Sequence, residues 1–412
     1  MADRQVQYLL IGGGLAAANC ARWLRESGAD GSVLLVGREP DPPYNRPPCS
    51  KEYMQGKAGR EEAYFRPDDW WEEQAIELVI RTSVLRLDAA QREARLSNRQ
   101  SVGFEHALVA TGANVRVLHV EGSELEGLHY LRTLRNVDSI LADAEDVEHV
   151  VLVGGSYIGT EVAASLTLRG KRCSILMQES VTLETGFGRT AGRFFQGVLE
   201  EHGIDVHGDD ALARFEGSSG RVERVVTQGG LELDAQLVVI GAGVHPDVTL
   251  AKSAGLELGE RGGIRCSAQL ETSAAGIYAA GDVCEYDSPY HERPVRIEHW
   301  DVAFNHGKTA ALNMLGKAQP HDVVPYFFSD LADWSSMEYV GPAYTWDEEI
   351  VRGSIDDGEF SLWYLQGGRV AAALSVGRSD DLEHARRLIA ERIDVSPRKA
   401  ELGDVDSELG NL

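Results

Sequence analysis

The sequence predicts an α/β protein in which one unit of strand, glycine turn, helix and strand occurs twice. The first copy spans residues 6–36 and the second spans residues 149–177. A chain of 412 residues is long enough for two or three domains. Its composition, with 43% hydrophobic and 25% charged residues, is typical of a globular protein. We therefore expect two α/β domains of one type within a larger globular chain.

The first unit carries a glycine-rich turn between an apolar strand and a helix. The strand VQYLLI at residues 6–11 leads directly into the sequence GGGLAA. In the dinucleotide-binding fingerprint GxGxx(G/A), the first glycine permits the tight turn and the second admits a pyrophosphate, while the last small residue allows close helix packing. Gly12, Gly14 and Ala17 hold these positions, and the helix N-terminus that follows would attract phosphates. This context favours a nucleotide site over a glycine turn without a ligand.

The second unit repeats the pattern with one departure. The strand HVVLV at residues 149–153 leads into the turn GGSYIG, which begins at Gly154. Ser156 replaces the second glycine of the fingerprint, which impairs the close approach of a phosphate without excluding it. Taken alone this turn is a weak signal. Because the same unit has already occurred once in the chain, we expect a second dinucleotide site here.

A carboxylate follows the second strand of each unit. Glu39, beside Arg38, stands after the strand SVLLV, where a side chain of this fold binds the ribose. Glu179 follows the strand RCSILM, and a carboxylate there would bind the adenosine ribose hydroxyls and repel a 2′-phosphate. The second unit is therefore expected to bind NADH rather than NADPH, although Arg172 at the start of the strand weakens that expectation.

Three more apolar strands end in turns of small residues. They are HALVATGA (106–113), LVVIGAGVHP (237–246) and AAGIYAAGDV (274–283). The first two are expected where the chain crosses between dinucleotide domains. In the third, Asp282 after Gly281 is placed to hold the polyol chain of a flavin nucleotide. Glycine and aspartate also occur in ordinary turns, but the order of the three segments favours two linked dinucleotide domains.

Charge and cysteine content restrict the partners and the compartment. The net charge of −25 argues against binding nucleic acid or an acidic membrane surface, and no apolar run reaches the roughly 18 residues of a membrane span. The five cysteines are scattered without a CxxC pair, which fits a reducing cytoplasm. The histidines lack metal-ligand spacing, so no metal is expected. The residues from Arg398 onward are poor in apolar side chains, and partial disorder is expected there.

Six motifs occur in order along the chain: IGGGLAA, PYNRPPCSK, ALVATGA, VVLVGGSYIGTEVAASL, AAGDV and EHWDVAFNHG. Together they resemble the FAD-dependent ferredoxin and rubredoxin reductases of oxygenase systems, and the related apoptosis-inducing-factor-like oxidoreductases. The resemblance covers nearly the whole chain and implies a glutathione-reductase-like arrangement. It implies an FAD domain from residues 1–118 and 247–322, an NADH domain from residues 119–246, and a C-terminal α+β domain from residues 323–412.

The same resemblance implies which residues contact each cofactor. For FAD they are Gly12, Gly14, Leu15, Ala16, Arg38 or Glu39, Arg46, Lys51, Val84, Ala110, Thr111, Gly112, Arg132, Gly281, Asp282 and Trp300. For NADH they are Gly154, Gly155, Ser156, Tyr157, Ile158, Gly159, Glu179, Gly241, Ala242, Gly243 and Glu298. His299 and Trp300 follow Glu298 in the chain, and the tryptophan either stacks beside the flavin or packs in the core.

The segment YNRPPCSKEY places a thiol two residues before a lysine. In the family that the chain resembles, the lysine of PxSK pairs with the glutamate of IGxEVA, which implies a pair of Lys51 and Glu161 here. A cation beside the flavin stabilises the negative charge that hydride transfer leaves on the ring. Cys49 has no CxxxxC partner, which excludes a dithiol mechanism. A lone thiol that cycles through sulfenic acid stays open, but a packing role is favoured.

Three functions remain open. The favoured one is an NADH-dependent flavoprotein reductase that passes electrons to a ferredoxin-like iron–sulfur protein. The second is an NADH oxidase, peroxidase or disulfide reductase that uses Cys49. The third is an apoptosis-inducing-factor-like protein that responds to NADH and turns over slowly. A homodimer is compatible with the sequence but is not required by it.

Overall fold

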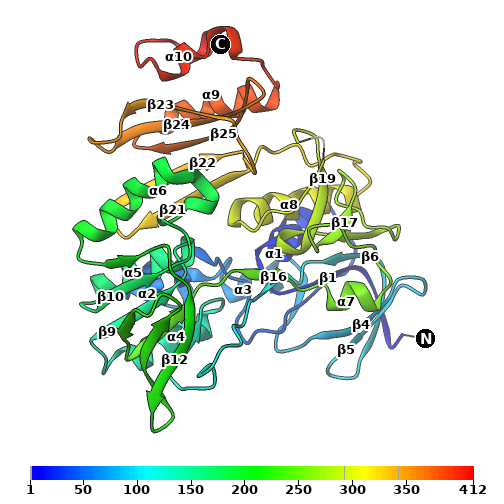
Figure 1. Cartoon of the computed structure of the whole chain (residues 1–412). Helices are drawn as coiled ribbons and strands as arrows, with labels where there is room; N and C mark the ends of the chain where they lie inside the picture. Colours follow the sequence, from blue (N-terminus) through cyan, green and yellow to red (C-terminus); the bar gives the residue numbers. More distant parts are fainter. Residues whose placement is uncertain (1, 292, 342) are drawn as a thin grey trace. The chain divides into compact units, whose positions relative to one another are not determined.

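The computed structural model describes residues 2–291, 293–341 and 343–412, and the chain divides into two compact units (Figure 1). The first unit consists of residues 2–45, 61–114 and 244–323, and the second of residues 46–60, 115–243 and 324–412. The predicted α/β class is confirmed. The predicted assignment of segments to FAD and NADH domains stays a prediction. It differs from this division most at residues 46–60, which pack within the second unit, and by a few residues at the other boundaries.

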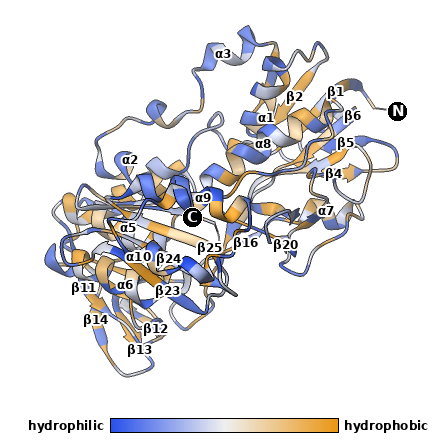
Figure 2. Cartoon of the chain, turned by 90° about the horizontal axis from the view of Figure 1, so that it is seen from above, coloured by the Kyte–Doolittle hydropathy of each residue, from blue (hydrophilic) through white to orange (hydrophobic). Residues whose placement is uncertain are grey.

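The first unit is built on a seven-stranded sheet with the order β3-β2-β1-β6-β5-β4, in which β18 also pairs with β6. Its strands are β1 (Arg4–Ile11), β2 (Val33–Val36), β3 (Ile76–Val79), β4 (Val84–Asp88), β5 (Glu93–Leu96), β6 (Ser101–Val109) and β18 (Ile277–Ala279). β4 and β5 are antiparallel to their neighbours, and the other strands run parallel. β2 is buried along its whole length and is apolar (Figure 2), as parallel strands covered on both faces are.

Two helices of the first unit, α1 (Leu15–Glu26) and α8 (Trp300–Met314), pack closely together. A Cβ atom on Gly307 would lie 2.4 Å from the Ala16 carbonyl oxygen, so a side chain does not fit at this crossing. The Asn19 side-chain amide also donates to the Phe304 carbonyl oxygen across the helices, at 2.6 Å. The start of α1, which follows the glycine turn, is thereby fixed against α8.

The first unit is completed by several short elements. They are η2 (Glu61–Ala63), α3 (Asp68–Glu73), α7 (Thr249–Ser253), η3 (Gly281–Val283) and the three-stranded sheet of β17 (Ile264–Cys266), β19 (Cys284–Ser288) and β20 (Arg293–Val295). β7 (Ala113–Val115) and β16 (Val244–Pro246) lie where the chain passes from one unit to the other. Among the described residues, no helix has the length and apolar character that a membrane crossing requires.

The second unit contains a parallel five-stranded sheet with the order β11-β10-β9-β15-β8. Its strands are β8 (Leu128–Tyr130), β9 (His149–Val153), β10 (Arg172–Leu176), β11 (Asp205–His207) and β15 (Leu237–Ile240), and its helices are α4 (Leu134–Ala144), α5 (Tyr157–Leu168) and α6 (Glu184–Glu201). An antiparallel sheet of β12 (Leu212–Ser218), β13 (Arg221–Thr227) and β14 (Glu232–Asp234) adjoins it. This order of alternating strands and helices is that of a dinucleotide-binding fold.

Residues 46–60 form a short segment that packs on α5. It contains η1 (Pro47–Cys49) and α2 (Glu52–Gln55). The Ser165 hydroxyl of α5 donates to the Ser50 carbonyl oxygen at 2.6 Å, and the Gln55 amide donates to the Ser165 hydroxyl oxygen at 3.0 Å. These buried and half-buried bonds fix the position of Lys51, which lies between the two short helices.

The C-terminal part of the second unit is an antiparallel sheet with the order β21-β22-β25-β24-β23, accompanied by helices (orange and red in Figure 1). Its strands are β21 (Tyr326–Leu331), β22 (Ser335–Val340), β23 (Glu348–Ser354), β24 (Glu359–Gln366) and β25 (Arg369–Val376). The helical elements are α9 (Ser379–Ala390), η4 (Ser396–Arg398), α10 (Ala400–Gly403) and η5 (Leu409–Asn411). The predicted C-terminal α+β domain is confirmed.

The expected disorder of the last residues was wrong. Arg352 of β23 is buried, and its guanidinium donates to the carbonyl oxygens of Glu401, Asp404, Val405 and Ser407. Leu402 and Leu409 are buried as well. Composition alone misled the prediction, because two apolar side chains and one buried arginine are enough to hold a short polar tail in place.

Candidate functional site

The first glycine turn leaves open space at the start of α1. Gly12 has a φ of +126°, and a Cβ atom there would lie 2.1 Å from the Ala110 carbonyl oxygen, so only glycine fits. A Cβ atom on Gly14 would instead meet nothing within 4 Å. Gly14 is also the N-cap of α1 and provides no side-chain hydrogen bond to the helix start. An unobstructed helix N-terminus fits a pyrophosphate, as the fingerprint predicts.

The residues after β2 lie in the same unit and already have partners. Arg38 forms an ion pair with Asp247 at 2.9 Å and donates to the Asn114 amide oxygen at 2.8 Å. Glu39 accepts a 2.6 Å hydrogen bond from the Tyr44 hydroxyl. Sequence reasoning missed Asp247 and Tyr44, because nothing in the spacing of these residues connects them to the strand end.

The turn that contains Asp282 lies against the start of α1. A Cβ atom on Gly281 would be 3.4 Å from the Ala16 Cβ atom. The Gly281 N–H donates to Nδ1 of the fully buried His306 at 3.2 Å. Burial, together with His321 nearby, holds the pKa of His306 well below its ordinary value, so the imidazole is neutral and Nδ1 stays free to accept. The structure thus brings together Gly12, Ala16, Ala110 and Gly281.

Thr111, Gly112 and the residues before α8 also fall in the first unit. The Thr111 hydroxyl donates to the Asp247 carbonyl oxygen at 2.7 Å, and Gly112 has a φ of +71°. The Trp300 indole donates to the Asn45 amide oxygen at 3.0 Å. Val84 begins β4, Glu298 is paired with Arg296, and His299 caps α8 by accepting from the Asp301 N–H.

The second glycine turn occupies the carboxyl end of β9. Gly154 has a φ of +113°, and a Cβ atom there would lie 2.5 Å from the Gly241 carbonyl oxygen. A Cβ atom on Gly159 would lie 1.9 Å from the Gly154 carbonyl oxygen, so the helix packs directly on the turn. Ser156 is the exposed N-cap of α5 and makes no capping hydrogen bond. The turn therefore keeps its geometry with serine at the second position.

The remaining predicted residues of the second unit surround this turn. Gly155 is buried, Tyr157 and Ile158 begin α5, and Gly241, Ala242 and Gly243 follow β15. Arg46 donates to the Arg132 carbonyl oxygen. Cys49 is buried, and all five cysteines of the chain are free thiols.

Glu179 and Arg172 lie at opposite ends of β10. Arg172 begins the strand and is paired with Asp205 at 3.0 Å. Glu179 follows the strand, is exposed, and accepts a 3.2 Å hydrogen bond from the Thr185 hydroxyl. Because a strand rises about 3.3 Å per residue, the arginine is too far away to neutralise the acidic side chain beside the glycine turn.

In the Lys51 cluster, the lysine is buried and lies between two carboxylates, of which Glu161 is buried and Asp330 is half-buried. Its ammonium nitrogen lies 2.8 Å from an Asp330 carboxylate oxygen and 3.5 Å from a Glu161 carboxylate oxygen. The ammonium also lies 4.5 Å from the centre of the Phe328 ring, which adds a cation–π contact. The structure thus brings the predicted Lys51 and Glu161 together. Sequence reasoning missed Asp330, since no motif spacing links residues so far apart in the chain.

Glu161 is held by two serine hydroxyls. Ser50 donates to one carboxylate oxygen and Ser329 to the other, both at 2.6 Å, and these bonds are buried. Burial raises the pKa of the Glu161 carboxyl above its ordinary value, while the Lys51 ammonium and the two hydroxyls act in the opposite direction. The cluster is therefore a charged centre in which every carboxylate oxygen of Glu161 has a donor.

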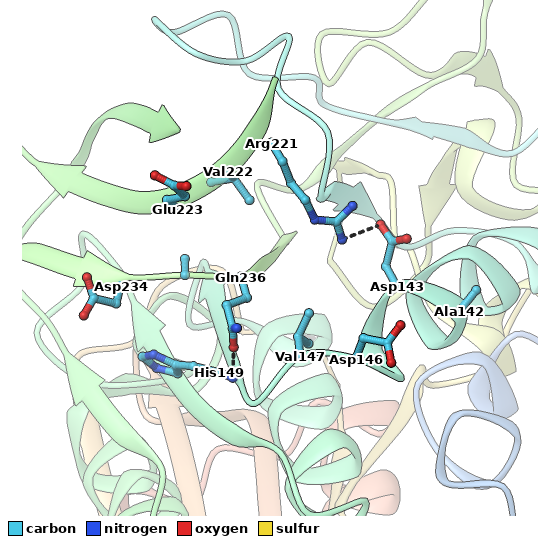
Figure 3. Close-up of a pocket in the computed structure, with 11 residues that line it drawn as sticks. Ala142, Asp143, Asp146, Val147, His149, Arg221, Val222, Glu223, Asp234 and Gln236 are labelled. Atoms are coloured by element: carbon cyan, nitrogen blue, oxygen red, sulfur yellow. Dashed lines mark hydrogen bonds and ion pairs between the residues drawn. The ribbon is translucent and has the colours of Figure 1, made fainter. Parts of the chain in front are cut away.

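A cavity of about 540 Å³ opens in the second unit, away from the glycine turn (Figure 3). It is lined by His149, which begins β9, by Gln236 before β15, and by Arg221, which forms an ion pair with Asp143 at 3.4 Å. His149 and Gln236 mark the amino ends of two parallel strands. Since ligands of such sheets bind at the carboxyl ends, this cavity is not the nucleotide site.

Two glycine-turn dinucleotide folds and a buried lysine between carboxylates define a class, the pyridine-nucleotide flavoprotein oxidoreductases. Residues 6–307 match the family model described as pyridine nucleotide-disulphide oxidoreductase, and residues 326–412 match the model described as reductase C-terminal. The chain belongs to the pyridine nucleotide-disulphide oxidoreductases. It is an enzyme whose cofactors are FAD and NAD(H).

Individual relatives agree with this assignment over the full length. Rhodocoxin reductase of Rhodococcus erythropolis is 30% identical over 404 residues, which is 98% of this chain and 94% of that protein. Putidaredoxin reductase of Pseudomonas putida is 32% identical over 401 residues, which is 96% of this chain and 94% of that protein. A solved covalent complex of putidaredoxin reductase with putidaredoxin gives a TM-score of 0.92 at 31% identity, and it covers 100% of this chain and 98% of that chain.

Proposed function

We propose that the protein takes hydride from NADH and passes the electrons one at a time to a ferredoxin-like iron–sulfur protein. One NADH and two oxidised acceptors would give NAD⁺, one proton and two reduced acceptors. FAD supplies the step from an electron pair to single electrons when it is bound. The observation that carries the proposal is the likeness, over the whole chain, to a reductase that was solved joined to its putidaredoxin.

The first unit would hold FAD at the carboxyl end of β1. The open space beside Gly14 and the start of α1 would receive the pyrophosphate. Glu39 or Arg38 would bind the ribose, and each is oriented by a protein partner, Tyr44 for Glu39 and Asp247 for Arg38. Asp282 would hold the ribityl chain, and the neutral His306 fixes the backbone of its turn. The other predicted FAD contacts are Leu15, Ala16, Arg46, Val84, Ala110, Thr111, Gly112, Arg132, Gly281 and Trp300.

The second unit would hold NADH at the turn after β9. Ser156 at the uncapped start of α5 would face the pyrophosphate, and Glu179 would bind the adenosine ribose hydroxyls. The other predicted contacts are Gly154, Gly155, Tyr157, Ile158, Gly159, Gly241, Ala242, Gly243 and Glu298. Glu161 follows this turn by less than two turns of α5, which connects the nicotinamide end of the site to the Lys51 cluster.

The preference for NADH over NADPH is expected to depend on Glu179. In the wild-type protein, kcat/KM for flavin reduction should favour NADH by at least about tenfold, because a carboxylate repels the 2′-phosphate. Glu179→Arg should reduce or reverse this ratio, measured by anaerobic stopped-flow absorbance. Glu201→Arg makes the same charge change on the exposed end of α6 and should leave the ratio unchanged. Equal effects of the two variants would show that overall charge sets the preference.

The acceptor is tested by comparing ferredoxins with oxygen. With saturating NADH, reduction of a suitable ferredoxin should exceed the direct oxygen reaction by at least about tenfold and should weaken as salt rises. Cys49→Ser should leave this rate unchanged. If no ferredoxin exceeds oxygen and Cys49→Ser stops turnover, the thiol function is correct instead. Slow reoxidation by every acceptor would favour the apoptosis-inducing-factor-like function.

The compartment and the oligomeric state complete the proposal. Five free, buried thiols support the expected reducing cytoplasm, where iron–sulfur proteins of this type would be reduced. A homodimer stays a prediction, and light scattering of the purified enzyme would test it.

A further inference from the structure

The Lys51 ammonium lies closer to Asp330 than to Glu161, the glutamate with which it was expected to pair. The distance to Asp330 is 2.8 Å, the length of a charge-assisted hydrogen bond, whereas the distance to Glu161 is 3.5 Å. Asp330 belongs to β21 of the C-terminal sheet. The lysine is therefore held mainly by a residue that lies outside both glycine-turn segments.

The hydrogen bonds around the two carboxylates explain this difference. Both oxygens of Glu161 already accept short bonds from Ser50 and Ser329, which satisfy much of its charge. In Asp330, one oxygen accepts from the Ser336 hydroxyl at 2.6 Å, and the other faces the ammonium. The serine fixes the rotation of the Asp330 side chain, so its second oxygen is directed at Lys51.

The negative charge of Asp330 also weakens the electrostatic effect of the Lys51 ammonium on its surroundings. With both carboxylates ionised, the three residues carry one net negative charge, and with Glu161 protonated they are neutral. In either state the Asp330 carboxylate cancels the positive charge of the ammonium. A cation stabilises negative charge on a neighbouring ring less strongly when a nearby anion already neutralises the cation.

We propose that Asp330 is a positioning residue for Lys51, and that its charge limits how strongly Lys51 raises the reduction potential of the flavin. This inference rests on the proposed function in one respect, namely that the flavin binds beside Lys51. It assigns to the C-terminal sheet a direct part in tuning the redox centre. Asp330 contacts the lysine, and we assign its effect on the flavin to that contact.

The first test is the flavin midpoint potential of the purified holoenzyme. Asp330→Asn keeps the size of the side chain and removes its charge, so the potential should rise. The expected rise corresponds to about a tenfold higher ratio of reduced to oxidised flavin, which is about 30 mV for a two-electron couple. Ser336→Ala, which frees the carboxylate without removing it, should shift the potential less and in the same direction. Asp333→Asn is the matched control, because this exposed aspartate lies in the turn of the same hairpin.

A second readout needs no electron transfer. Mass spectrometry can follow acylation of Lys51 in the oxidised holoenzyme, where its side chain is only 5% exposed. Asp330→Asn should raise this rate about tenfold, the effect of losing one charge-assisted hydrogen bond, and Asp333→Asn should not. If Asp330→Asn matches Asp333→Asn in both measurements, the inference is wrong even when the wild-type enzyme reduces ferredoxin. If no ferredoxin is reduced but both shifts occur, the proposed acceptor fails and the role of Asp330 stands.

Discussion

A Gly14→Glu variant is expected to be folded and colourless. A side chain at this position would meet no protein atom within 4 Å of its Cβ, and the φ of −94° suits any residue, so the backbone tolerates the change. The glutamate would, however, place its charge at the start of α1, where the pyrophosphate of FAD would bind. Flavin absorbance of the purified protein measures the loss, and far-ultraviolet circular dichroism checks the fold.

Two further variants separate loss of binding from loss of structure. Gly14→Ala should keep most of the flavin, because it adds a single methyl group to open space. Gly12→Ala should fail to fold properly, since its Cβ atom would collide with the Ala110 carbonyl oxygen at a φ of +126°. A yellow Gly14→Glu protein with a full complement of FAD would contradict the assignment of this turn to the flavin.

Replacing Lys51 by methionine is expected to slow flavin reduction by NADH about a hundredfold, which is typical when one preorganised electrostatic contact is removed. The midpoint potential should fall with it, because the ring loses its cation. Anaerobic stopped-flow absorbance of the flavin measures the rate. Lys51→Arg keeps the charge and should restore part of it, which distinguishes an electrostatic role from a purely structural one.

Cys49→Ser is the comparison that decides between lysine and thiol chemistry. The two residues lie in the same short segment, and both are buried. If Lys51 is the functional residue, the serine variant should reduce its flavin within about threefold of the wild-type rate, since serine replaces sulfur with a slightly smaller atom. A larger loss in Cys49→Ser than in Lys51→Met would overturn the electrostatic role and support a sulfenic acid cycle.

The sequence was sufficient for the two nucleotide folds because their signals are local. Gly12 and Gly154 each stand directly between an apolar strand and a helix, and this pattern is visible within a few residues. The collision that requires glycine there involves Ala110 or Gly241, far away in the chain. Glu161 was found only through a family resemblance. Asp330 and Asp247 were not found, because each reaches its partner from a distant part of the chain, and neither spacing nor composition records such a contact.

For the C-terminal residues from Arg398 onward, the prediction was wrong in another way, because it missed an ordered segment rather than a single contact. Its composition predicts disorder, yet one buried arginine holds four of its carbonyl oxygens. A composition rule averages over side chains, whereas a buried guanidinium must find acceptors and takes them from whatever backbone is near. Arg352 stands in an edge strand of otherwise ordinary sequence, so its partners could not be foreseen from the sequence.

The division into two units also constrains how the protein is synthesised. The chain passes between the units five times, after residues 45, 60, 114, 243 and 323, so neither unit corresponds to one continuous stretch of the gene. No single cut would release either unit as a whole. During translation, Lys51 leaves the ribosome long before β21. The ion pair of Lys51 and Asp330 can therefore form only after β21 has been synthesised, when most of the chain has been made.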